Sequence, residues 1–370
     1  MRKNSIYIRI IIFIIITIAI VFLNFKGRTQ LSGNNSRLTI IKWDNFYSGN
    51  NIHFYYLNPQ NENLLKVKAK YGLNNLIDTK ADTMDNSIKI MEFLNSKIKA
   101  QSTAMDSDKS TIEIMEMAFN GAKISDSDYA TIYEECLTSL GINARRGVLQ
   151  STDNNIKGKS YFNVCEIWSD KYQKWIMIDG VNGCYMSEKQ IPLSAVEIIS
   201  KGIEKVEITL LKNTNKYIKN MSKYYGTYSI SVDNNRYGEL KSNSQVTFLM
   251  GEQLPKIETK EGFTKPTIFV NDPQIFNSSP KTEYANNNKE TTPTLIFAKT
   301  DLKSDAKGEA NFIVGAFMNS YMLADYFLSV NGGDYIKVDR FFELKIVEGL
   351  NNIKLSQDGK TLMREVVIEK

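Results

Sequence analysis

The groups best suited to nucleophilic chemistry are three thiols, Cys136, Cys165 and Cys184, and the only imidazole belongs to His53. A cysteine nucleophile requires a thiolate, which a helix N-terminus or a neighbouring histidine normally stabilises. Zinc sites need cysteine pairs about two to four residues apart with histidines close by, and the sequence lacks this spacing. We therefore expect no metal ion and no other cofactor, and at most one intrachain disulfide.

Two ordered stretches carry a pattern that points to chemistry. The first reads Ile-Ser-Asp-Ser-Asp-Tyr-Ala at 124–130 and continues with Leu-Gly-Ile-Asn-Ala-Arg at 140–145. The second reads Glu-Ile-Trp at 166–168 and, after a polar turn, Trp-Ile-Met-Ile-Asp at 175–179. Together they resemble the motifs of the transglutaminase-like superfamily, which places a cysteine, a histidine and an aspartate on a papain-like fold. The resemblance covers roughly 64–204 and is similar to bacterial members.

Residue by residue, the resemblance implies a nucleophile position at Asp126, a base position at Phe162 and an orienting position at Asp179. Phenylalanine carries no proton, and an aspartate held ionised at a helix start is a weak nucleophile. The resemblance therefore implies an inactive member, a pseudoenzyme. Other matching positions, which the resemblance assigns to packing the helix and the hairpin, are Tyr129, Ala130, Gly141, Arg145, Glu166, Trp168 and Trp175.

The three positions also have structural interpretations. Asp126 stands between two serines before an apolar-periodic run, and these residue types favour a helix N-cap. Asp179 would be a partly buried carboxylate satisfied by backbone donors, by Arg145 or by Arg146. Phe162 would fill the space of the missing imidazole and make the floor of the cleft more apolar.

No other side chain replaces the missing thiol. Cys136 follows about ten residues into the same predicted helix, roughly 15 Å from its start, where the helix dipole does not activate it. Alternation along the strand places Cys165 on the face opposite Phe162. Ser125 lies at the helix start, but a serine nucleophile needs a base, and we interpret the distant His53 as structural.

Three functions remain open at this stage. The first is a binding or scaffolding protein that holds a peptide, cell-wall or protein partner in the inherited cleft or on the C-terminal domain. The second is a repurposed hydrolase in which Asp126, Glu166 and Asp179 supply an acid and a base. The third is a structural spacer. A filled space between Asp126, Phe162 and Asp179 favours the spacer, an open aromatic cleft favours binding, and converging carboxylates in an open cleft favour catalysis.

The elements that must position these residues are a helix and a following hairpin. Tyr161–Trp168 and Lys174–Asp179 are short apolar segments joined by a polar turn, which predicts the hairpin. Helices that precede strands predict an α+β fold, with helices packed on an antiparallel sheet. Apolar residues recur at helical spacing in three segments, Thr83–Lys99, Thr111–Phe119 and Ser127–Leu140.

The rest of the chain divides by composition. Leu38–Trp43 and Ile52–Leu57 read as strands that lead into a transglutaminase-like domain over 38–235. An Asn-rich and Pro-containing stretch marks 236–293 as an irregular or linker region. Short strand-like segments predict a C-terminal β-sandwich over 294–370, namely Leu295–Phe297, Ala310–Ala316, Tyr326–Val330, Tyr335–Val338, Phe342–Ile346, Asn352–Leu355 and Glu365–Ile368.

The N-terminus predicts a membrane location. The apolar run Ile10–Phe25 follows three cations and precedes two more, and no small-residue cleavage site comes after it. We expect residues 1–27 to be an uncleaved anchor with the body outside the membrane; a cleaved signal peptide is the alternative. The net charge of +5 is spread along the chain without a basic run of aromatic spacing, so nucleic acid is not an expected partner.

Overall fold

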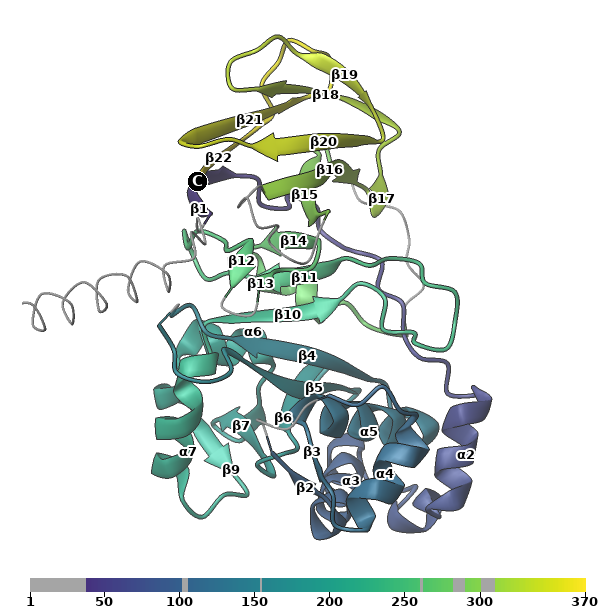
Figure 1. Ribbon diagram of the computed structural model, residues 1–370. Coiled ribbons are helices and arrows are strands. Elements are labelled where there is room, and N and C mark those ends of the chain that lie inside the picture. The colour runs from purple at the N-terminus through teal and green to yellow at the C-terminus, as the bar shows by residue number, and fades with distance from the viewer. Residues whose placement is uncertain (1–37, 102–105, 154, 260–261, 282–289, 301–309) are drawn as a thin grey trace, which may run out of the picture.

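The computed structural model describes residues 38–101, 106–153, 155–259, 262–281, 290–300 and 310–370 (Figure 1). Over these residues the chain is a mixed α and β protein whose sheets are mainly antiparallel. The predicted anchor at 1–27 lies outside the described residues. Among the helices that are described, none has the length and apolar character needed to cross a bilayer.

Four helices gather on one side of the larger sheet (Figure 1). The three predicted helices are confirmed and correspond to α3, α4 and α5, because their apolar residues at helical spacing meet in one core. Each helix begins at a side chain that accepts a hydrogen bond from a first-turn backbone N–H. The elements are α2 (Glu62–Lys70), η1 (Leu73–Leu76), α3 (Thr83–Lys97), β2 (Lys99–Ala100), α4 (Thr111–Phe119), β3 (Lys123–Ile124) and α5 (Asp126–Ser139).

The larger sheet has the strand order β14-β11-β10-β4-β5-β6-β7-β8, with β9 paired to β7. The predicted hairpin is confirmed as β5 and β6, in which Cys165 lies opposite Ile178. Cys165 and Ile178 belong to the helical core, whereas Phe162 and Met177 belong to a second core on the other face, which α6 and α7 help to cover. The elements are β4 (Ala144–Gln150), β5 (Tyr161–Ser169), β6 (Lys174–Asp179), β7 (Cys184–Glu188), β8 (Ile191–Pro192), α6 (Ala195–Lys201), η2 (Ile203–Lys205), β9 (Glu207–Thr209), α7 (Thr214–Met221), η3 (Ser222–Tyr224) and β10 (Thr227–Ser231).

The region 236–293 is not the irregular linker that the composition suggested. Its strands β11 and β14 pair in parallel, and β11 pairs with β10, so the region extends the larger sheet. The prediction failed because strands of four residues between turn-rich stretches are too short to show a clear period. The elements are β11 (Gln245–Phe248), β12 (Glu258–Thr259), β13 (Gly262–Phe263), β14 (Thr267–Val270) and η4 (Pro273–Asn277).

Two further sheets make up the C-terminal part. One has the order β1-β22-β21-β18-β19, and in the other β16 pairs with β15, β17 and β20. Both contribute to one apolar cluster that includes Phe312, Tyr326 and Ile353. The predicted strand segments of this part are confirmed as strands. They are β15 (Thr294–Lys299), β16 (Ala310–Met318), β17 (Tyr321–Met322), β18 (Asp325–Val330), β19 (Ile336–Asp339), β20 (Phe341–Ile346), β21 (Leu350–Ser356) and β22 (Arg364–Glu369).

The segment at the start of the described chain joins the C-terminal part. β1 (Thr39–Asp44) is the strand predicted at Leu38–Trp43, and it pairs with β22 instead of leading into the helical part. Such a distant pairing leaves no local signal in the sequence. The second predicted strand, Ile52–Leu57, is absent as a strand, because only Tyr55 forms an isolated bridge, to Asp233.

Candidate functional site

The N-terminus of α5 is capped by Ser125, not by Asp126. The Ser125 hydroxyl accepts a hydrogen bond from the backbone N–H of Asp128 at 2.9 Å, and Ser125 has an extended backbone. Asp126 is the first helical residue. The structural interpretation of Asp126 as the cap is therefore wrong by one residue, because the neighbouring serine has the cap conformation.

Asp126 instead joins α5 to strand β5. Its Oδ2 accepts hydrogen bonds from the backbone N–H and the side-chain amide of Asn163, at 2.7 and 2.8 Å. Its Oδ1 accepts from Lys159 Nζ at 2.8 Å. The side chain is fully buried. Because these donors stabilise the carboxylate and shield it from solvent, Asp126 is a structural anion and a poor nucleophile.

Phe162 packs in the core on the far side of β5. Its ring lies 5.7 Å from the ring of Tyr224, measured between centroids, and its side chain is buried. As strand alternation predicted, Cys165 lies on the opposite face, where its Sγ donates to the carbonyl oxygen of Ala130 in α5 at 3.2 Å. An aromatic ring therefore occupies the position where the resemblance implies a base.

Asp179 is satisfied by neighbours other than the two arginines that the sequence offered. Its carboxylate accepts from the backbone N–H and the amide of Asn182, at 3.0 and 2.8 Å, and from the Tyr217 hydroxyl at 2.7 Å. Arg145 pairs with Glu166 and Arg146 with Glu134, so neither is available to Asp179. Burial raises the pKa of Asp179, and the nearby charge of Asp126 adds to the rise. The two aspartates therefore lie within electrostatic reach of each other.

The space around the three triad positions is filled. Asp126, Phe162 and Asp179 are all buried, and no hydrogen bond between any two of them exists in the described chain. By the criterion set from the sequence, a filled space favours a structural role at this place.

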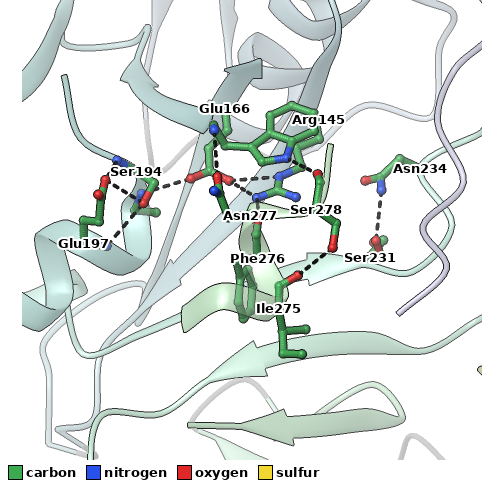
Figure 2. Close-up of polar contacts among 12 residues, drawn as sticks. Arg145, Glu166, Ser194, Glu197, Ser231, Asn234, Ile275, Phe276, Asn277 and Ser278 are labelled. Atoms are coloured by element: carbon green, nitrogen blue, oxygen red, sulfur yellow. Dashed lines mark hydrogen bonds and ion pairs between the residues drawn. The ribbon is translucent and has the colours of Figure 1, made fainter. Parts of the chain in front are cut away.

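Arg145 and Glu166 form the most buried ion pair of the fold, and Figure 2 shows it. Arg145 Nε and Nη2 donate to Glu166 Oε2 at 2.9 and 2.7 Å, and Glu166 Oε1 accepts from the backbone N–H of Ala195 at 2.9 Å. The guanidinium lies 4.0 Å from the Trp175 ring centroid and also donates to the Phe276 carbonyl. The pair ties β4 and β5 to α6 and η4, so Glu166 has a different set of partners from Asp126 and Asp179.

The remaining motif residues also serve packing. The Tyr129 hydroxyl donates to Asn95 Oδ1 at 2.8 Å, and the rings of Trp168 and Trp175 meet edge to face at 5.7 Å. The Trp175 indole N–H donates to the Ser278 carbonyl at 2.9 Å. These contacts hold α5, the hairpin and η4 in register.

The three cysteines are free, buried thiols. Burial raises the pKa of Cys136, Cys165 and Cys184, which keeps each of them protonated near neutral pH. A protonated thiol without solvent access is neither a nucleophile nor a metal ligand.

Several residues at the site carried no recognisable signal in the sequence. Lys159 and Asn163 complete the surroundings of Asp126, and Tyr217 completes those of Asp179. Only strand alternation could have pointed to Asn163, because it places residue 163 on the helix side of β5.

Comparison with known proteins adds little to this geometry. No family model and no curated protein matches the sequence. A proposed cysteine protease from Cytophaga hutchinsonii is 16% identical over 35% of this chain and 40% of that chain, with a TM-score of 0.26. A proposed protease from Parabacteroides distasonis is 9% identical over 40% of this chain and 28% of that chain, with a TM-score of 0.25. The chain thus spans less than half of either protein, and no activity is carried over from them.

Proposed function

We propose that this protein is a non-catalytic member of the transglutaminase-like superfamily, held outside the membrane, that binds or scaffolds a partner. The observation that carries the proposal is the state of the triad positions. Asp126, Phe162 and Asp179 are buried, and each is engaged by its own neighbours. A phenylalanine takes no proton, and an aspartate with three donors attacks no carbonyl. The placement of α5 against β5, together with the buried Arg145–Glu166 pair, supports the resemblance on which the proposal rests.

Because the former cleft is filled, a partner needs another surface. A cavity of about 600 Å³ lies between the segment 52–55, the loop 240–244 and the outer face of β16. Leu240, Tyr321 and Phe341 are largely exposed at this cavity. Clustered exposed apolar side chains are typical of surfaces that bind peptides or proteins. We infer that a peptide or protein partner binds here and not at the triad positions.

A glycine shapes the floor of this cavity. A Cβ atom on Gly315 would lie 2.3 Å from Met322 Cε and 3.3 Å from the Phe341 ring. The missing side chain therefore lets Met322 and Phe341 lie across β16, where both face the cavity. His53, the only histidine, also lines the cavity and stacks on Tyr55 at 4.3 Å between ring centroids.

A carboxylate-based hydrolase is the competing function. It would use Asp126, Glu166 and Asp179, but Glu166 is fully buried against Arg145 and all three lack access to solvent. General acid and base catalysis needs a group within hydrogen-bond reach of the substrate. The observed geometry therefore supports binding over hydrolysis.

The test is an activity assay on the full chain, with labelled casein as the hydrolysis substrate and labelled casein plus a primary amine for cross-linking. We expect no turnover above buffer, with or without iodoacetamide, because no thiolate is available. Turnover that disappears in Cys165→Ala or after alkylation would overturn the proposal. Turnover that survives alkylation but disappears in Asp126→Asn and Asp179→Asn would instead establish the hydrolase.

A further inference from the structure

A second cavity, of about 410 Å³, lies beside the first half of α5. Its walls come from α5, from the segment 106–111 and from the turn at Arg236 and Tyr237. It is separate from the triad positions, because Asp126, Phe162 and Asp179 do not line it. Its size lies within the range of roughly 300–1,000 Å³ in which proteins bind small molecules.

Two neighbouring carboxylates form the base of this cavity. Glu135 is 1% exposed, and its Oε1 accepts from Arg236 Nη2 at 2.7 Å and from the Tyr237 hydroxyl at 2.8 Å. No described residue donates to its other oxygen, Oε2. Glu134, behind it, shares the pattern: Oε2 pairs with Arg146 Nε at 3.1 Å, and Oε1 has no donor in the described chain. A buried acceptor without a donor is unfavourable by about 1–3 kcal/mol.

The two arginines are already engaged on their other nitrogens. Arg146 Nη1 and Arg236 Nη1 both donate to Thr131 Oγ1, at 2.9 and 3.1 Å. They therefore have little capacity left to neutralise further carboxylates. The unfilled hydrogen-bonding capacity at the base of the cavity is that of acceptors, which calls for a ligand that donates.

The rim of the cavity adds negative charge. Asp128 accepts from the backbone N–H of Ser107 at 3.1 Å; burial raises the pKa of Asp128, and the charge of Asp106 raises it further. Asp106 and Asp108 are exposed at the entrance, where Lys109 is the cation among the lining residues of 106–111. Repulsion between these carboxylates would be relieved by a bound cation.

A metal ion does not fit this arrangement. Among the residues that the structure describes, no group of three or more Asp, Glu, His or Cys side chains is placed to hold one. We propose that the cavity binds an organic cation, an ammonium or guanidinium group on a short alkyl chain. The cationic head donates to Glu135 Oε2 and lies between Asp128 and the rim carboxylates, and the alkyl chain lies against Ile112 and Ile114. The proposal rests on the binding role proposed above, to which it gives a ligand class.

Such a cation comes either from a free amine or from a lysine or arginine side chain of a peptide. Calorimetry on the full chain at low salt uses butylammonium and butylguanidinium as free cations, with butyrate and butanol as anionic and neutral probes. Gly-Lys-Gly and Gly-Arg-Gly, compared with Gly-norleucine-Gly, form the peptide arm. We expect both cations to bind and butyrate and butanol not to bind. Tighter binding of the tripeptides than of the free cations assigns the side chain of a peptide as the source, and weaker binding assigns a free amine.

Three variants test the site. Glu135→Gln removes the buried charge and should weaken cation binding at least 10-fold. Asp106→Asn with Asp108→Asn changes only exposed rim residues, so it keeps the fold, and should weaken binding about 3-fold. Glu239→Gln, exposed and paired with Lys241 outside the cavity, is the charge-matched control and should bind as the parent does.

The proposal is overturned if neither cation binds the parent chain, if butyrate binds equally well, or if the rim double variant and Glu135→Gln both bind cations as the parent does. If Glu135→Gln fails to fold, as near-ultraviolet circular dichroism would show, the rim variant decides alone. These results are independent of turnover: a thiol-dependent hydrolytic rate would end the proposed function while leaving cation binding measurable.

Discussion

Glu290 holds the turn between β16 and β17 through a charged hydrogen bond, which its Oε2 accepts from the backbone N–H of Asn319 at 2.8 Å. Burial raises the pKa of Glu290 to about 7, although Asn319 and the charge of Arg364 oppose the rise. The folded chain therefore binds this proton more tightly than the unfolded chain does. The stability that the proton contributes is complete below the usual glutamate pKa and is lost as the pH rises through 7.

Glu290→Gln mimics the protonated carboxyl at every pH. Relative to this variant, the parent should lose about 1 to 2 kcal/mol of unfolding free energy between pH 4.5 and pH 7, after allowance for solvent screening. Urea unfolding at a series of pH values measures the difference. Glu343→Gln, at an exposed position on β20, is the control and should track the parent. A constant difference between Glu290→Gln and the parent would contradict the prediction.

At the scale of elements, β1 connects the two halves of the fold. It pairs with β22 in the C-terminal sheet, and its Trp43 ring lies 5.3 Å from Phe269 of β14 and 5.9 Å from Phe297 of β15. β14 belongs to the larger sheet, so one side chain packs on both parts. Loss of this ring should weaken both parts together.

Trp43→Ala should destabilise the chain by about 3–5 kcal/mol, the usual loss for a large buried aromatic residue. Scanning calorimetry should show one transition shifted to lower temperature, with the helical circular dichroism signal moving in step. Ile41→Ala changes a residue of the same strand that is 47% exposed, and should alter stability by less than about 0.5 kcal/mol. A helical signal that keeps its midpoint in Trp43→Ala would show that the parts unfold independently.

At the scale of the whole molecule, the apolar run Ile10–Phe25 with its flanking cations supports an anchor that leaves the body outside the membrane. The full chain should then sediment with membranes and stay there in carbonate at high pH, whereas a chain starting at residue 28 should remain in the supernatant. Protease added to intact cells should remove the body. Recovery of soluble protein that has lost the residues before Lys26 would identify a cleaved signal peptide instead.

The sequence by itself determined the local elements. α3, α4 and α5 follow from apolar residues at helical spacing, and the β5–β6 hairpin from two short apolar segments around a polar turn. Strand alternation also placed Cys165 and Phe162 on opposite faces of β5. These features depend on neighbours within a few residues, so their signal is contained in a short window of sequence.

The tertiary structure decided which partner each buried group meets. Asp126 is bonded to Lys159 and Asn163, which lie 33 and 37 residues away, and Asp179 to Tyr217, 38 residues away. β1 pairs with β22 across almost the whole described chain. A buried polar group takes whichever donor the packing brings within about 3 Å, and no short pattern encodes that choice. Only the packed structure therefore shows that the triad positions are filled and that the open cavities lie elsewhere.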